Sequence, residues 1–355
     1  MRYDRRVKAV SRKRLHRLAN IAEVAASAGV AKATVSRVVN GTAAVREPTR
    51  RRVEEAILAL DYRPSQIARG LSRGRTMKVA VIAPFFTHPS AVLLLQGAEE
   101  RLTAASYDIV LYNVGRPEQV DEQFRNALDG RPDGVLVITM PPPAREMKRL
   151  LDARVPVVLV DFGHPAFTNT YIDNVAGGYI ATRHLIELGH RRIAFIGDPS
   201  INPYGFNSSV DRCVGFRRAM AESDLEIPAE YIKEGQHARH VAHRLTAELL
   251  NLKEPPTAVV AASDTQALGV LDGANNLGVE VSQELSVIGF DDIEVAAYVG
   301  LTTVRQPLVL SGQRGAELLL ETIAAPHPPP TPIAEQLPLE LIVRKSSAPP
   351  KLGRR

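Results

Sequence analysis

Several features that define other protein classes are missing from this sequence of 355 residues. The single cysteine, Cys213, excludes an intramolecular disulfide and a zinc site built from several cysteines. No apolar run reaches the roughly 18 residues of a membrane-spanning helix. The basic N-terminus also lacks the apolar segment of a secretory signal. We therefore expect a cytoplasmic protein with no membrane partner.

Signatures of catalysis are missing as well. The chain has no glycine-rich phosphate loop, no G-x-S-x-G elbow and no metal-binding motif, so we expect neither an enzyme nor a cofactor. His237, His240 and His243 are three residues apart and could share one flank of a helix. No carboxylate or cysteine completes this set at short range, which favours a solvated flank and no metal.

The charge is unevenly spread along the chain. The net charge is +5, yet residues 1–78 carry 19 basic against 6 acidic side chains, and the remainder carries 25 against 33. A basic N-terminal segment followed by an acidic remainder is typical of a protein whose N-terminal part, here called the head, binds a polyanion. A disordered basic tail remains the alternative for residues 1–17, but the excess also covers a patterned, foldable segment.

Residues 21–40 predict two short helices joined by a tight turn. Apolar residues recur at intervals of three and four in both segments: Ile21, Val24, Ala25 and Ala28, then Val35, Val38 and Val39. Gly29 separates the two stripes, and Ala33 and Arg37 point away from the second. This is the pattern of a helix-turn-helix, whose second helix can enter a DNA major groove.

A third helix and a linker complete the head. Pro48 suits a first helical turn, and an apolar stripe follows it at Val53, Ala56, Ile57 and Leu60. We expect a flexible basic arm over 1–19, a helix-turn-helix domain over 20–63, and a linker with weak helical character over 64–76.

The pattern of apolar residues changes after Met77. Short β-rich apolar runs such as KVAVIAP, DGVLVIT and SVIGF alternate with helical patterns, which indicates α/β structure with parallel sheets buried on both faces. We expect a core over 77–345 made of two subdomains, 77–174 plus 305–324 and 175–304 plus 325–345. A proline-rich loop over 324–332, a last strand over 337–343 and a tail over 346–355 complete the chain.

Polar residues follow several of the expected strands. In open α/β sheets, ligands bind beyond the carboxyl ends of the strands. The residues at such ends are Asp161, Asp173, Ser263, Asp264 and Asp291. The sequence therefore predicts a ligand cleft between the two subdomains.

These segments together resemble the LacI family of bacterial transcription repressors. The resemblance runs from about residue 20 to 350 through VAASAGVAKATVSRVVNG, YRPSQIARGL, GYIATRHLIELGHRRIAFIG, SVIGFDD, LTTVRQP and LIVRKSSAPP. It implies a homodimer on a palindromic double-stranded operator, associated with the nucleoid when bound. It also implies a core similar to a periplasmic sugar-binding protein, with a small-molecule effector in the cleft.

The resemblance assigns roles in the head. Lys32, Ala33 and Arg37 match positions that reach base edges, and an arginine can donate two hydrogen bonds to guanine. Thr34, Ser36 and Asn40 suit phosphates, although Asn40 suits a helix cap equally well. The family often has Ser or Thr at Ala31, the N-cap of the second helix, and alanine forgoes that cap.

The linker resembles the family's hinge helix. Leu71 matches a leucine that is inserted into the central minor-groove step, where apolar wedges unstack and kink DNA. Ala68 is small enough for two hinge helices to approach closely. Packing of Leu71 on the protein's own core is the alternative.

In the core, the resemblance implies a set of effector-binding residues at strand ends and in loops: Ser90, Asp161, Phe206, Arg212, His237, Ser263, Asp264 and Asp291. Aspartate and arginine suit polyols because each can form paired hydrogen bonds with adjacent hydroxyls. Helix capping is the alternative for Asp264. Ser90 and Ala91 depart from the aromatics that many relatives have there.

The expected function is an effector-controlled repressor, with a sugar or sugar derivative as the first candidate effector and a nucleobase as the second. A sugar-binding transport protein would share the core but would need export and no basic head. An α/β enzyme with a nucleic-acid-binding appendage would need a nucleophile or a cofactor loop, and we find neither.

Overall fold

The computed structural model describes residues 19–40, 44–62, 75–153, 155–325 and 331–351, and its chain divides into two compact units at Met77 and Lys78. None of the described helices is long and apolar enough to cross a membrane. The two units are the head and the core that the sequence predicts.

The head holds three helices, α1 (Ile21–Ala28), α2 (Lys32–Asn40) and α3 (Glu47–Ala59). Their apolar faces meet in one small core, formed by Val24, Ala25, Ala28, Val35, Val53, Ala56 and Tyr62. Asn20 caps α1 by accepting hydrogen bonds from the backbone of Ala22 and Glu23, and the Glu23 carboxylate accepts one from the Asn20 N–H in return. Gly29 ends α1 at φ 64°, a left-handed conformation that glycine adopts without strain.

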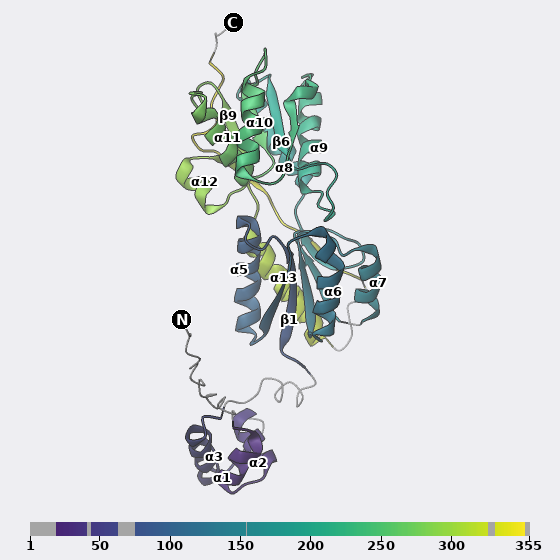
Figure 1. Ribbon diagram of the computed structural model, residues 1–355, viewed down its shortest axis with the longest axis vertical. Helices are drawn as coiled ribbons and strands as arrows, with labels where there is room; N and C mark the ends of the chain where they lie inside the picture. Colours follow the sequence, from purple (N-terminus) through teal and green to yellow (C-terminus); the bar gives the residue numbers. More distant parts are fainter. Residues whose placement is uncertain (1–18, 41–43, 63–74, 154, 326–330, 352–355) are drawn as a thin grey trace, which may run out of the picture. The chain divides into compact units, whose positions relative to one another are not determined.

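The first half of the core is a six-stranded parallel sheet. Its strands are β1 (Lys78–Pro84), β2 (Asp108–Val114), β3 (Gly134–Ile138), β4 (Val157–Val160), β5 (Thr168–Tyr171) and β11 (Ala334–Gln336), in the order β11-β5-β4-β3-β1-β2. Its helices are α5 (Pro89–Ala104), α6 (Val120–Asp129), α7 (Ala144–Asp152) and α13 (Leu308–Ala324). Figure 1 shows α5 and α13 on one side of this sheet and α6 and α7 on the other, so both faces are covered.

The second half repeats this plan. Its strands are β6 (Ile193–Gly197), β7 (Ile232–Glu234), β8 (Ala258–Ala261), β9 (Ser286–Asp291), β10 (Thr302–Arg305) and β12 (Glu340–Ile342), in the order β12-β10-β9-β8-β6-β7. Only the edge strand β12 is antiparallel to its neighbour. Its helices are α8 (Asn174–Glu187), α9 (Ser208–Ala221), α10 (Arg239–Leu250), α11 (Asp264–Asn276) and α12 (Glu294–Val299).

The chain passes between the two halves three times: after β5, after β10 and between β11 and β12. We expected residues 325–345 to belong to the second subdomain, but Ala334–Gln336 pairs with β5 in the first sheet. Three residues without alternation carry no signal for which sheet they join, and pairing with a strand more than 160 positions earlier decides it.

Close helix packing stiffens each half. A Cβ on Gly97 of α5 would lie 1.9 Å from the Val309 carbonyl oxygen of α13, and one on Gly312 would lie 2.0 Å from the Leu94 carbonyl oxygen. In the second half, Gly178 of α8 and Gly215 of α9 interlock in the same way. These glycines let the helix backbones touch.

Candidate functional site

Helix α2 of the head presents a narrow polar face. Val35 is fully buried, whereas Lys32, Ala33 and Arg37 are exposed, and Ala33 and Arg37 share one face at a spacing of four residues. Thr34 and Ser36 lie partly buried at its sides. The arrangement gives one arginine, one lysine and one methyl group to whatever surface α2 meets.

Not every residue predicted for this surface is visible. Asn40 is the last residue of α2, and Ala68 and Leu71 lie outside the described residues. The start of α2 matches the expectation, because the Ala31 carbonyl accepts hydrogen bonds from Thr34 and Val35 while its methyl side chain can accept none.

The core has a cavity of about 850 Å³ at the carboxyl ends of both sets of strands. Seven of the eight predicted effector residues line it: Ser90, Asp161, Phe206, Arg212, His237, Ser263 and Asp291. The volume is that of a small-molecule site. Four non-glycine residues in its wall have positive φ, namely Phe85, Thr139, Asp161 and Asp291. Strained backbone of this kind clusters at binding sites.

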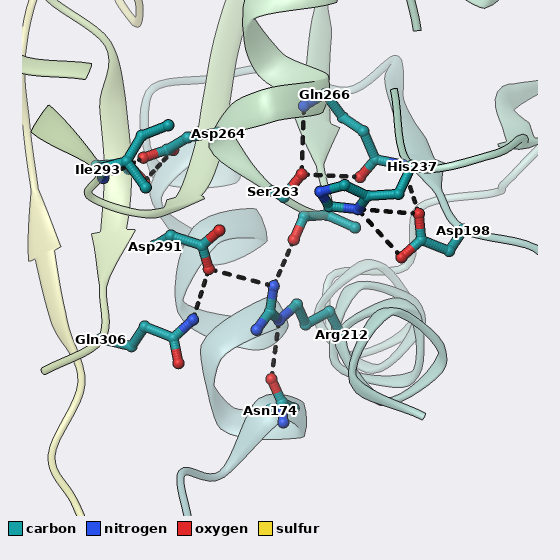
Figure 2. A network of polar contacts seen from close by, with 12 residues as sticks. Asn174, Asp198, Arg212, His237, Ser263, Asp264, Gln266, Asp291, Ile293 and Gln306 are labelled. Carbon is teal, nitrogen blue, oxygen red and sulfur yellow. Dashed lines mark hydrogen bonds and ion pairs between the residues drawn. The ribbon is translucent and has the colours of Figure 1, made fainter. Parts of the chain in front are cut away.

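Arg212 organises the polar floor of the cavity (Figure 2). Its Nε donates to Asn174 Oδ1 at 2.8 Å, and its Nη1 donates to the Ala262 carbonyl at 2.6 Å. Nη1 also lies 3.7 Å from Asp291 Oδ1, and the guanidinium lies 3.5 Å from the centre of the Phe290 ring. Asp291 Oδ1 also accepts a hydrogen bond from Gln306 Nε2 at 2.5 Å, whereas its contact with Arg212 is an ion pair. The guanidinium is therefore locked in one orientation.

Asp161 differs from Asp291 because no described residue donates a hydrogen bond to its carboxylate. Burial raises the pKa of Asp161 to about 7, against the opposing charge of Arg212 and with a smaller upward contribution from Asp291. A carboxylate in this position can accept hydrogen bonds from a ligand.

His237 lies on the other side of the cavity. Its Nδ1 is 3.2 Å from Asp198 Oδ1, which also accepts a hydrogen bond from Gln266 at 3.0 Å. Burial acts to lower the pKa of His237, but the hydrogen bond and charge of Asp198 outweigh it and the pKa is raised. His88 stacks on His237 with 5.3 Å between ring centres, and burial and His237 together lower the pKa of His88.

Aromatic rings form a wall beside these polar groups. Tyr204 and Phe206 stack at 5.3 Å, and Phe85 meets the Tyr204 ring edge-on at 5.0 Å. The Tyr204 hydroxyl donates to the Gly115 carbonyl at 3.2 Å, which joins the two halves of the core. Phe85 and His88 thus supply rings near Ser90 and Ala91, where the sequence lacks them.

Asp264 is the predicted effector residue that does not reach the cavity. Its carboxylate is fully buried and accepts hydrogen bonds from Thr303 Oγ1 at 2.6 Å and the Ile293 backbone at 2.9 Å. Ser263, not Asp264, caps α11. A Cβ on Gly289 would lie 2.2 Å from Asp264, so that glycine makes room for the carboxylate. Asp264 therefore serves the packing of the α11–β9 junction.

Sequence reasoning missed several cavity residues: Phe85, His88, Asn174, Asp198 and Gln306. Phe85 and His88 belong to a loop whose unusual composition was visible, and Asp198 follows the strand run RRIAFIG. Asn174 and Gln306 carry no such signal. His237 and His243 do not share one flank of a helix, because His237 precedes α10 and contacts Asp198 whereas His243 lies in α10 and contacts Asn276. Among the described residues, no group of His, Cys, Asp and Glu has metal-binding geometry.

A three-helix head with an exposed second helix, joined in one chain to a two-sheet core with a cavity, defines a ligand-controlled DNA-binding regulator. Comparison with known proteins agrees. Residues 20–65 match the family described as bacterial regulatory proteins, lacI family, and residues 182–347 match a periplasmic binding protein-like domain.

The chain is 35% identical over 315 residues to the HTH-type transcriptional repressor PurR of Pectobacterium carotovorum, covering 87% of this chain and 91% of that protein. It is also similar to the lac repressor dimer bound to operator and the anti-inducer ONPF, with a TM-score of 0.82, 25% identity and coverage of 93% and 99%. A LacI-family regulator of Enterococcus faecium with bound ribose matches with a TM-score of 0.68, 27% identity and coverage of 77% and 100%.

The chain belongs to the LacI family. It is a DNA-binding transcription repressor controlled by a small-molecule effector, and not an enzyme.

Proposed function

We propose that this repressor binds a palindromic operator as a homodimer and that a sugar or sugar derivative in the core cavity controls its affinity. The observation that carries the effector class is the cavity floor, where Asp161, Asp291 and Arg212 converge beside aromatic rings. Carboxylates and a guanidinium bind adjacent hydroxyls, and rings cover the apolar face of a sugar. The ribose-bound relative supports the same class.

On the DNA side, we assign base contacts to the exposed residues of α2, with Arg37 as the main reader and Lys32 and Ala33 beside it. Thr34, Ser36 and Asn40 suit phosphate contacts, which fix register and not sequence. Ala68 and Leu71 are assigned to paired hinge helices at the operator centre. A set of three base-facing residues carries little sequence information, so dimer symmetry has to supply the rest.

Selection of binding sites from a pool of random duplexes tests the DNA half. We expect enrichment of two inverted half-sites. For Arg37→Ala, affinity for that site should fall by about 1–3 kcal/mol per half-site, while weak salt-sensitive binding persists. Arg125→Ala, which removes an exposed arginine from α6 of the core, is the control and should leave selection unchanged. Enriched sites without inverted symmetry would contradict the palindrome.

The effector half is tested by a thermal-shift screen of sugars, sugar derivatives and nucleobases, followed by operator binding with and without each hit. A sugar should stabilise the protein and change operator affinity. Hits confined to nucleobases would make the second candidate the effector class.

A further inference from the structure

The charge of the effector can be inferred from the charges that line the cavity, and this inference rests on the proposed function. The acidic side chains are Asp161, Asp198, Asp211 and Asp291, and the basic ones are Arg212, His88 and His237. Among the described lining residues there is no lysine and no second arginine. An anionic ligand would have to find its countercharge within this set.

Arg212 is not available as that countercharge. Its guanidinium is bound to Asn174 and to the Ala262 carbonyl, lies beside Asp291 and covers the Phe290 ring. The Arg212–Asp291 pair is already neutral as a unit. A phosphate that reached Arg212 would also meet the Asp291 carboxylate, and like charges brought together in a buried site cost several kcal/mol.

The histidines are committed in the same way. His237 is paired with Asp198, so a proton on its ring is balanced by that carboxylate (Figure 2). His88 stacks on His237, and its pKa is lowered by burial and by that neighbour, which keeps it neutral at pH 7. Neither ring supplies a net positive charge for a ligand.

Helix N-termini also attract anions, and several begin near the cavity. Two of these ends are occupied by the chain itself. The Asp173 carboxylate accepts a hydrogen bond from Ala176 at the start of α8, and Ser263 Oγ accepts one from Gln266 in α11. Asp211 places a negative charge in the first turn of α9, and Pro89 at the start of α5 has no N–H.

Uncharged hydroxyl and amide groups also line the cavity, and α10 begins beside it after Ala238 without a side-chain cap. Among the described residues, Asp161 and Asp211 are the lining carboxylates with neither an ion pair nor a hydrogen bond, and Asp161 is the one that stands beside Asp291. A hydroxyl can donate to this carboxylate, whereas a phosphate or carboxylate group on a ligand would be repelled by it. We propose that the effector is an uncharged polyhydroxy compound, and that Asp161 is the residue that rejects phosphorylated and acidic analogues.

Matched pairs of compounds test this on the full-length protein by titration calorimetry and thermal shift. The pairs are ribose and ribose 5-phosphate, glucose with glucose 6-phosphate and gluconate, and adenosine with its monophosphate. At pH 9, where a carboxyl group with a pKa of about 7 is ionised, any neutral member that binds should do so at least about 100-fold more tightly than its anionic partner. In Asp161→Asn that ratio should fall below about 10, because the neutral compound loses an acceptor and the anion loses a repelling charge. Asp152→Asn, an exposed aspartate at the end of α7, should keep the wild-type ratio.

A second experiment compares the melting temperature in inorganic phosphate with that in chloride at equal ionic strength. It needs no knowledge of the effector. Phosphate should change the melting temperature of the wild type and of His237→Gln equally, since any binding then lies outside the cavity. Stabilisation by phosphate that His237→Gln abolishes, or an anion that binds more tightly than its neutral partner, would overturn the proposal.

Different results would contradict the proposal on effector charge and the proposal that the effector controls operator binding. An acidic or phosphorylated compound that changes operator affinity would leave effector control intact and remove only the inference on charge. Neutral compounds that bind through Asp161 without changing operator affinity would leave the inference on charge intact and remove the regulatory role.

Discussion

Individual aspartates in this core show how far residue type alone can be interpreted. Asp161, Asp264 and Asp291 all come at strand ends, and the resemblance predicts all three as effector-binding residues. Asp161 lacks a donor from the described protein, Asp291 pairs with Arg212 and Gln306, and Asp264 is satisfied by Thr303 and Ile293. The sequence places all three near the same edge, but the partners that separate ligand contact from packing come from distant segments.

Effector affinity should depend on pH through Asp161. Burial raises the pKa of Asp161 to about 7, and hydroxyl donors from a bound effector favour the ionised form, so effector binding lowers that pKa. Affinity should therefore be full above pH 7 and should fall as the pH drops below 7, with a proton released on binding near neutrality. Calorimetry in buffers of different ionisation enthalpy measures this release.

The Asp161→Asn variant is the control for this titration. Its affinity should be lower and flat across the same range, because the amide does not ionise. A wild-type affinity that rises as the pH falls would contradict the assignment of Asp161.

At the scale of elements, the strong patterns predicted the structure well. The three head helices, the Gly29 turn and the alternation of buried strands with helices follow from apolar periodicity and are confirmed. Strand β11 was missed because its sheet is set by pairing with β5, which no local pattern encodes. The contact between Phe85 and Tyr204 was missed for the same reason, since the two residues come from loops of different halves.

The start of α2 offers a test of a local rule. Ala31 leaves the first N–H groups of α2 without a side-chain acceptor, whereas Asn20 caps α1. Ala31→Ser should stabilise the head by about 1 kcal/mol, and Asn20→Ala should destabilise it by about the same amount. Hydrogen exchange of the α2 amides in the full-length protein measures both. Unchanged exchange in Ala31→Ser would show that α2 needs no cap.

The α5–α13 contact offers a second test at this scale. Gly97→Ala should destabilise the core by about 3 kcal/mol, because its Cβ would overlap the Val309 carbonyl, which is backbone and cannot rotate away. Gly163→Ala is the matched control, since its nearest neighbour would be the Tyr171 ring at 3.4 Å, an ordinary contact. Denaturant unfolding measures the difference, and equal stabilities would mean that the helices separate at little cost.

For the whole molecule, the placement of the cavity matters more than any single contact. Its lining comes from both halves of the core, and the chain crosses between those halves three times. A ligand that touches both halves has different affinities for arrangements in which they are closer or further apart. Such a difference is the only means by which a ligand can shift a conformational equilibrium.

Coupling between effector and operator must be reciprocal, and this gives the last prediction. If a bound effector changes operator affinity by some factor, operator DNA must change effector affinity by the same factor, whichever direction the control takes. Titrating effector into the free protein and into the protein–operator complex measures one factor, and operator binding with and without saturating effector measures the other.

Asp291→Ala, which removes a partner of Arg212 from the cavity floor, should bring both factors to one while leaving basal operator affinity unchanged. Loss of operator binding in that variant would instead assign Asp291 to folding, and unequal factors in the wild type would mean that the effector also binds outside this cavity.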